Sequence, residues 1–126
     1  MERSTKEAIE GEFGQPGVQN PMMLDLIALD PATDMVVLTM IERRAWGTDP
    51  RQIQQIEEKI NRYMGYVLDG FLAEQYPQYI GKRVLVSLRC IAEPGDVYAR
   101  FVVAARQALA AHGIGFDVQV VADTAG

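Results

Sequence analysis

The hydrophobic pattern of the chain begins with two short apolar runs. Leu24–Leu29 and Met35–Ile41 are rich in branched and long apolar side chains, and Asp30-Pro31-Ala32-Thr33-Asp34 separates them. Asp at the first turn position and Pro at the second are typical of a type I turn. The pattern therefore predicts an antiparallel β-hairpin.

A long amphipathic helix is predicted after the hairpin. In Asp49-Pro50-Arg51-Gln52, Asp49 is expected to cap free N–H groups, and Gln52 is expected to complete a capping box. Apolar residues then recur every three or four positions, at Ile53, Ile56, Ile60, Met64, Val67 and Phe71. Gly70 marks an end or a kink of this helix, and Tyr76-Pro77 ends any helical segment after Gly70.

The last third of the chain has the pattern of a β-α-β unit. Residues 83–91 alternate between apolar and polar, Asp96 is expected to cap a second helix that ends at Gly113, and Phe116 begins a last alternating strand. The order β-β-α-β-α-β predicts a two-layer α+β fold. We expect a four-stranded mixed sheet with both helices on one face.

The domain boundaries follow from the same pattern. Residues 1–21 are interrupted by Gly and Pro, so they are expected to be a flexible N-terminal arm or extension. Residues 22–122 are expected to form a single α+β domain, and residues 123–126 a loose tail.

Both faces of the predicted hairpin are apolar. Leu26 and Ala28 lie on one face of the first strand, whereas Ile27 and Leu29 lie on the other. Helices on one side of the sheet cannot cover both faces, so a second copy of the chain or the N-terminal arm is expected to cover the remaining one. A homodimer is our preferred interpretation, with Ile27 and Leu29 among the partner-binding residues.

The loop after the hairpin is a second candidate partner surface. Arg43, Arg44 and Trp46 are residue types enriched at binding hot spots. In the alternative interpretation, Trp46 closes the open end of the core, while the arginines stay solvated and pair with Glu57 or Glu58.

The hairpin also carries several carboxylates. Asp25, Asp34 and Glu42 could hold a divalent metal ion that orients water, as in a hydrolase or nuclease. The alternative is structural, because Asp30 and Asp34 flank a turn in which Asp forms local hydrogen bonds.

Composition narrows the possible functions. The 126 residues carry a net charge of −5, which disfavours nucleic acid and anionic membranes as partners. The single cysteine, Cys90, cannot form an intramolecular disulfide, and the single histidine, His112, is expected to complement a helix C-terminus. No apolar run reaches the length of about 20 residues that a membrane span needs, and no cofactor motif is present. A cytoplasmic protein without a cofactor is the expectation.

The chain also resembles a family of small bacterial proteins known only as a domain of unknown function. The resemblance extends from Asn20-Pro21 to about Val121. It is carried by Leu24-Asp25-Leu26-Ile27, Asp30, residues 33–39, Trp46, Glu58-Lys59-Ile60-Asn61 with Tyr63, Gly70, Tyr76-Pro77 and Gly113-Ile114. This resemblance implies no activity.

The sequence thus favours a non-catalytic module that self-associates or binds another protein. Two alternatives remain at this point. One is a metal-dependent hydrolase or nuclease that uses the hairpin carboxylates. The other is a toxin-neutralising, immunity-type protein, for which acidic charge would help to capture a basic partner.

Overall fold

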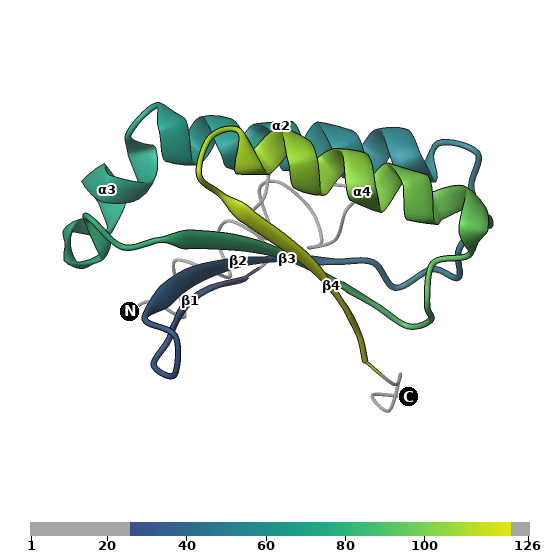
Figure 1. Ribbon diagram of the computed structural model, residues 1–126, viewed down its shortest axis with the longest axis horizontal. Coiled ribbons are helices and arrows are strands. Elements are labelled where there is room, and N and C mark those ends of the chain that lie inside the picture. The colour runs from purple at the N-terminus through teal and green to yellow at the C-terminus, as the bar shows by residue number, and fades with distance from the viewer. Residues whose placement is uncertain (1–25, 122–126) are drawn as a thin grey trace, which may run out of the picture.

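Four strands form one mixed sheet, and the helices lie along one side of it (Figure 1). The computed structural model describes residues 26–121. In chain order, the elements are β1 (Leu26–Asp30), β2 (Met35–Ile41), α2 (Gln52–Leu68), α3 (Phe71–Gln75), the 3-10 helix η1 (Pro77–Tyr79), β3 (Val84–Cys90), α4 (Asp96–Ala110) and β4 (Gly115–Val120).

The strands follow each other across the sheet in sequence order. β1 pairs with β2 in antiparallel orientation, whereas β2–β3 and β3–β4 are parallel. The predicted α+β fold with a four-stranded mixed sheet is confirmed. The structure adds α3 and η1, two short helical elements between α2 and β3.

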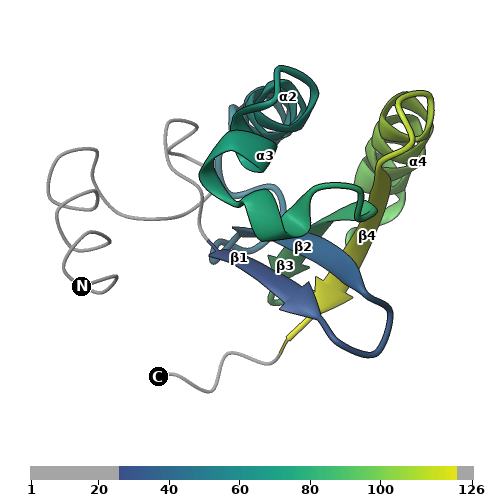
Figure 2. The same ribbon diagram turned by 90° about the vertical axis from the view of Figure 1, so that its left-hand side faces the viewer.

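Both long helices cover the same face of the sheet (Figure 2). Apolar side chains of β2, β3 and β4 point toward them because alternate residues of a strand face the same side. The fully or nearly buried core consists of Val36, Leu38, Met40, Ile56, Ile60, Tyr63, Leu72, Val84, Val86, Leu88, Val102, Ala105, Leu109, Ile114 and Phe116. The helix-facing side of the sheet is therefore the hydrophobic centre of the protein.

The helix starts differ from the sequence prediction. The Asp49 carboxylate accepts the backbone N–H of Arg51 at 2.9 Å, but α2 begins only at Gln52, whose side chain bonds to the preceding loop instead of completing a capping box. Asp96 is not a cap either. It is the first residue of α4, and Gly95 precedes it without a side-chain cap. An acidic residue in this first turn still complements the helix dipole.

The helix ends are set by glycine. Gly70, with φ +89°, separates α2 from α3, so Phe71 leaves the apolar stripe of α2 and is 50% exposed. At the end of α4, Gly113 has φ +76°; its N–H bonds to Ala110 O, and the N–H of Ile114 bonds to Leu109 O. This pair of bonds is a Schellman motif, which confirms the predicted cap at Gly113.

The hairpin turn is built around Asp30. Its carboxylate accepts the backbone N–H of Ala32 and the hydroxyl of Thr33, and its carbonyl accepts the N–H of Asp34 at 2.7 Å. Asp34 has φ +59°, a conformation that Asp tolerates better than most residues. The expected local hydrogen bonds are present for the Asp30 side chain, whereas the Asp34 carboxylate contacts Lys82 on another segment.

Candidate functional site

The loop that follows β2 is organised around a buried carboxylate, Glu42. The N–H of Glu42 donates to Arg89 O, which continues the pairing of β2 with β3 and turns the Glu42 side chain into the interior. Only 1% of Glu42 is exposed. A buried carboxylate needs strong hydrogen-bond donors, and the loop supplies them from Arg44.

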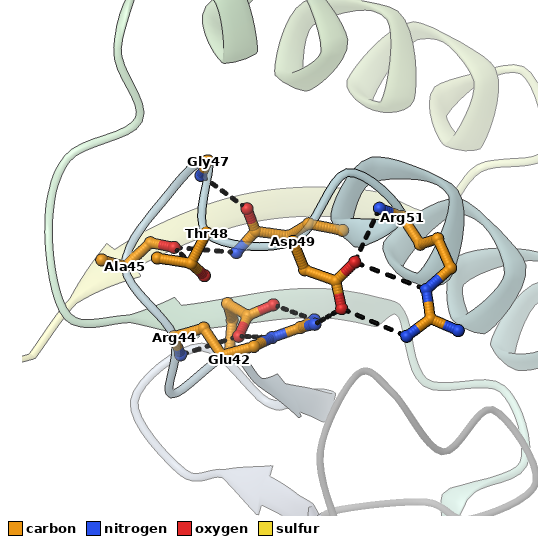
Figure 3. Close-up of polar contacts among 8 residues, drawn as sticks. Glu42, Arg44, Ala45, Gly47, Thr48, Asp49 and Arg51 are labelled. Atoms are coloured by element: carbon orange, nitrogen blue, oxygen red, sulfur yellow. Dashed lines mark hydrogen bonds and ion pairs between the residues drawn. The ribbon is translucent and has the colours of Figure 1, made fainter.

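Arg44 binds this carboxylate through three donors (Figure 3). Its Nη2 lies 2.8 Å from Glu42 Oε1, and its Nε and backbone N lie 2.9 and 2.8 Å from Oε2. Its remaining nitrogen, Nη1, reaches Asp49 Oδ2 at 3.1 Å. The hydrogen bond to Glu42 is the main reason why the pKa of Arg44 is raised above its ordinary value. The guanidinium thus joins the end of β2 to the start of α2.

Asp49 stands between two arginines. Its carboxylate accepts the backbone N–H of Arg51 and also receives side-chain contacts from Arg51 and Arg44. These contacts, the backbone hydrogen bond first, lower the pKa of Asp49. Arg44 therefore pairs with Glu42 and Asp49. The expectation that a loop arginine would pair with Glu57 or Glu58 is wrong for Arg44.

Gln52 fixes the middle of the same loop. Its Oε1 accepts the N–H of Gly47 at 2.8 Å, and its Nε2 donates to Ala45 O at 3.4 Å. Gly47 has φ +87°, and a Cβ there would lie 3.3 Å from the Tyr98 hydroxyl. Glycine is therefore favoured at this position by both backbone conformation and space.

Trp46 connects the loop to the segment that follows β3 and to α4. Its Nε1–H donates to Ala92 O at 2.8 Å, and its ring centroid lies 5.0 Å from that of Tyr98. Cys90 Sγ lies 3.3 Å from the same carbonyl, and burial raises the pKa of this thiol. Trp46 also packs against the hydrophobic core, in agreement with the structural interpretation of this residue.

Of the three loop residues predicted to bind a partner, the side chains of Arg44 and Trp46 are thus engaged within the chain. Arg43 is exposed, and its side chain makes no hydrogen bond or ion pair within residues 26–121. Arg43 is therefore the loop residue that remains accessible to a partner.

The carboxylates of the metal hypothesis do not converge. Asp34 forms an ion pair with Lys82 at 2.9 Å beside the hairpin turn, and Glu42 is bound by Arg44 at the opposite end of β2. Asp34 and Glu42 are eight positions apart along an extended segment, which places them about 26 Å apart, too far to share one ion. Asp25 lies outside the described residues. Within residues 26–121, no three His, Cys, Asp or Glu side chains are grouped as metal ligands.

The remaining face of the sheet lies opposite α2 and α4. We name it the open face, because within residues 26–121 neither long helix lies over it (Figure 2). From strand alternation and register, its members are Leu26, Ala28, Met35, Val37, Thr39, Ile41, Leu85, Ser87, Arg89, Gly115, Asp117 and Gln119.

The two expected hairpin contact residues point the other way. Ile27 and Leu29 are half-buried and pack against the core on the helix side. Leu26, Ala28 and Val37 occupy the open face instead. Alternation along the strands assigns Ile27 and Leu29 to one face of the sheet and Leu26 and Ala28 to the other. Which of these faces packs against the helices depends on the side of the sheet on which the segments containing α2 and α4 cross.

Sequence reasoning missed the polar centre of the open face. Thr39, Ser87 and Asp117 align across β2, β3 and β4, and Ser87 is only 2% exposed. Ser87 Oγ and Asp117 Oδ1 are buried without a hydrogen-bond partner within residues 26–121. Ser87 and Asp117 occupy polar positions of alternating strands, whereas Thr39 is the only polar residue of the apolar strand β2.

Lys59 is another buried charge that the pattern did not identify. It is fully buried on α2, with Nζ 5.9 Å from the Tyr63 ring centroid. Lys59 lies three residues after Ile56 and four before Tyr63, so helical spacing places it on the apolar stripe.

Comparison with known proteins identifies a family whose function is unknown. No curated protein matches the chain, and no solved structure matches it. No helix within residues 26–121 is long and apolar enough to span a membrane. The model of the family of unknown function DUF6572 matches residues 17–122, and the chain therefore belongs to this family.

Proposed function

We propose that this protein is a non-catalytic module that associates with a second copy of itself through the open face. The observation that carries the proposal is that, within residues 26–121, the two long helices α2 and α4 both lie on one face of the sheet (Figure 1). It refines the expected homodimer by moving the contact from Ile27 and Leu29 to their neighbours in the sheet.

The composition of the open face supports association. A sheet with one solvated face normally alternates between apolar and polar residues, but β1 and β2 present Leu26, Ala28, Met35, Val37 and Ile41 on this side. Leu26 is 39% exposed, and the three β2 residues of this set are partly exposed. Burial of such a surface against another chain is favourable because it removes apolar area from water.

The polar loop supports a structural role rather than catalysis. The carboxylate of Glu42 is bound by Arg44, and Asp49 is held by the same guanidinium. A general base needs a carboxylate that can reach a substrate proton, whereas these two are engaged in holding the loop.

Native mass spectrometry of the full chain, purified without chelator, tests the proposal. We expect a ligand-free dimer, and Val37→Glu should convert it to a monomer by placing a charge in the contact. The matched control is Val103→Glu, because Val103 is 50% exposed on α4, away from the open face. A wild-type monomer at all concentrations, or a stoichiometric bound metal or small molecule, would overturn the proposal.

A further inference from the structure

The interior of the open face carries an arginine and an aspartate that form no ion pair within residues 26–121. Arg89 on β3 is exposed, and its side chain makes no hydrogen bond or ion pair within residues 26–121. Asp117 on β4 is partly exposed and forms no ion pair within residues 26–121, although its Oδ1 is buried and accepts no hydrogen bond from these residues. Asp117 pairs in register with Ser87, and Arg89 lies two residues further along β3, so the two charges are diagonal neighbours on the same face.

We propose that Arg89 of each copy forms an ion pair with Asp117 of the other, and that these two reciprocal pairs fix how the open faces meet. This inference rests on the proposed self-association. A twofold dimer brings the same patch of both chains together, so a patch that contains both signs of charge is complementary to itself.

The other charges of this side are less suited to the role. Asp30 is bonded to its own turn through Ala32 and Thr33. Arg83 precedes the first residue of β3 and lies at the margin of the sheet. Arg89 and Asp117 are therefore the pair that the interior of the face provides.

The reciprocal pairing also places the apolar residues at the contact. Consider a twofold axis that lies between two facing sheets and places Arg89 of one copy opposite Asp117 of the other. With strands about 4.8 Å apart and a rise of about 3.3 Å per residue, this axis runs diagonally across the face. It crosses β2 between Val37 and Thr39 and reaches β1 near Ala28. The axis therefore passes over the centre of the open face.

The same arrangement pairs larger apolar side chains. Leu85 of one copy lies opposite the region between Leu26 and Ile41 of the other. Leu85 lies across β4, because its Cδ1 is 3.0 Å from where a Cβ of Gly115 would be. One geometry thus satisfies both the charges and the apolar half of the face.

Charge reversal in the full chain tests the inference, with mass measured by light scattering after size exclusion. In Arg89→Glu, both pairs of the homodimer become repulsive, and the same holds for Asp117→Arg. Each variant should therefore raise the dimer Kd at least about 100-fold. An equimolar mixture of the two variants should recover a dimer, because both pairs of the heterodimer are attractive again. Arg83→Glu, the matched control, should remain dimeric.

The outcomes separate this inference from the proposed function. If both single variants stay dimeric while Val37→Glu is monomeric, the open face associates but the reciprocal ion pairs do not exist. Circular dichroism shows whether each variant is folded, and a mixture of folded variants that stays monomeric overturns the inference. A monomeric wild-type protein overturns both proposals.

Discussion

At the scale of single residues, the structure depends on how a buried carboxylate is satisfied. Glu42 is removed from water at the end of β2, and three donors of one arginine replace the lost hydration. Because Arg44 comes only two residues later, the chain must turn sharply to return the guanidinium. The loop conformation and the ion pair therefore stabilise each other.

Glu42→Ala should lower the free energy of unfolding by about 2–3 kcal/mol, because Arg44 then loses its main partner in a part-buried site. Urea unfolding followed by circular dichroism measures the change. Glu57→Ala is the control: Glu57 is exposed on α2, and its removal should change stability by no more than about 0.5 kcal/mol. Equal losses for both variants would contradict this account.

Cys90 should be chemically inert in the folded protein. The side chain is 2% exposed, and burial raises its pKa, so the reactive thiolate is suppressed near neutral pH. Labelling with a thiol reagent at a pH of about 7.5, below the ordinary pKa of a cysteine thiol, should be slow in buffer and fast in denaturing urea. Rapid labelling of the native protein, at the rate of free cysteine, would be inconsistent with this burial.

At the scale of elements, two glycines of the helices have opposite requirements. Gly113 has φ +76° and closes the Schellman motif of α4, so a side chain there is strained. Gly65 lies within α2 in ordinary helical conformation, and an added Cβ would meet Asp69 Oδ2 at 3.8 Å, an ordinary contact distance. The same substitution should therefore have opposite effects at these two positions.

Gly113→Ala should destabilise the protein by about 1 kcal/mol because alanine disfavours positive φ. Gly65→Ala should stabilise it by about 0.5–1 kcal/mol, because alanine lowers the backbone entropy lost on helix formation. Thermal unfolding of the two variants beside the wild type measures both signs. A change of the same sign in both would show that backbone conformation does not control these positions.

At the scale of the whole molecule, the proposed self-association through the open face links folding to dimer formation. If two copies bind through the open face, the dimer is populated only by folded chains, and mass action stabilises them. Stability should then depend on protein concentration.

The Tm of the wild-type protein should rise as its concentration increases over about two orders of magnitude, as measured by differential scanning fluorimetry. Val37→Glu should remove this dependence, because it acts on association at the open face. Val103→Glu should retain it. A Tm of the wild type that does not change with concentration would contradict association in this range.

The sequence determined much of the architecture because the signals were local. Alternation in β3 and β4, the spacing of Ile56 and Ile60, and the need for positive φ at Gly113 each depend on a few neighbouring residues. Local propensity and hydrophobic periodicity are sufficient for such elements. The α+β fold and the order of its elements were therefore predictable.

Tertiary structure decided which side of each strand is buried and which charges meet. The crossovers through α2 and α4 place Ile27 and Leu29 against the core and leave Val37 on the open face, although alternation permits either assignment. Likewise, Glu42 could be identified as structural only after its side chain was seen inside the protein beside Arg44. These features depend on contacts between separate elements, and their energies come from burial and pairing in three dimensions rather than from the local sequence.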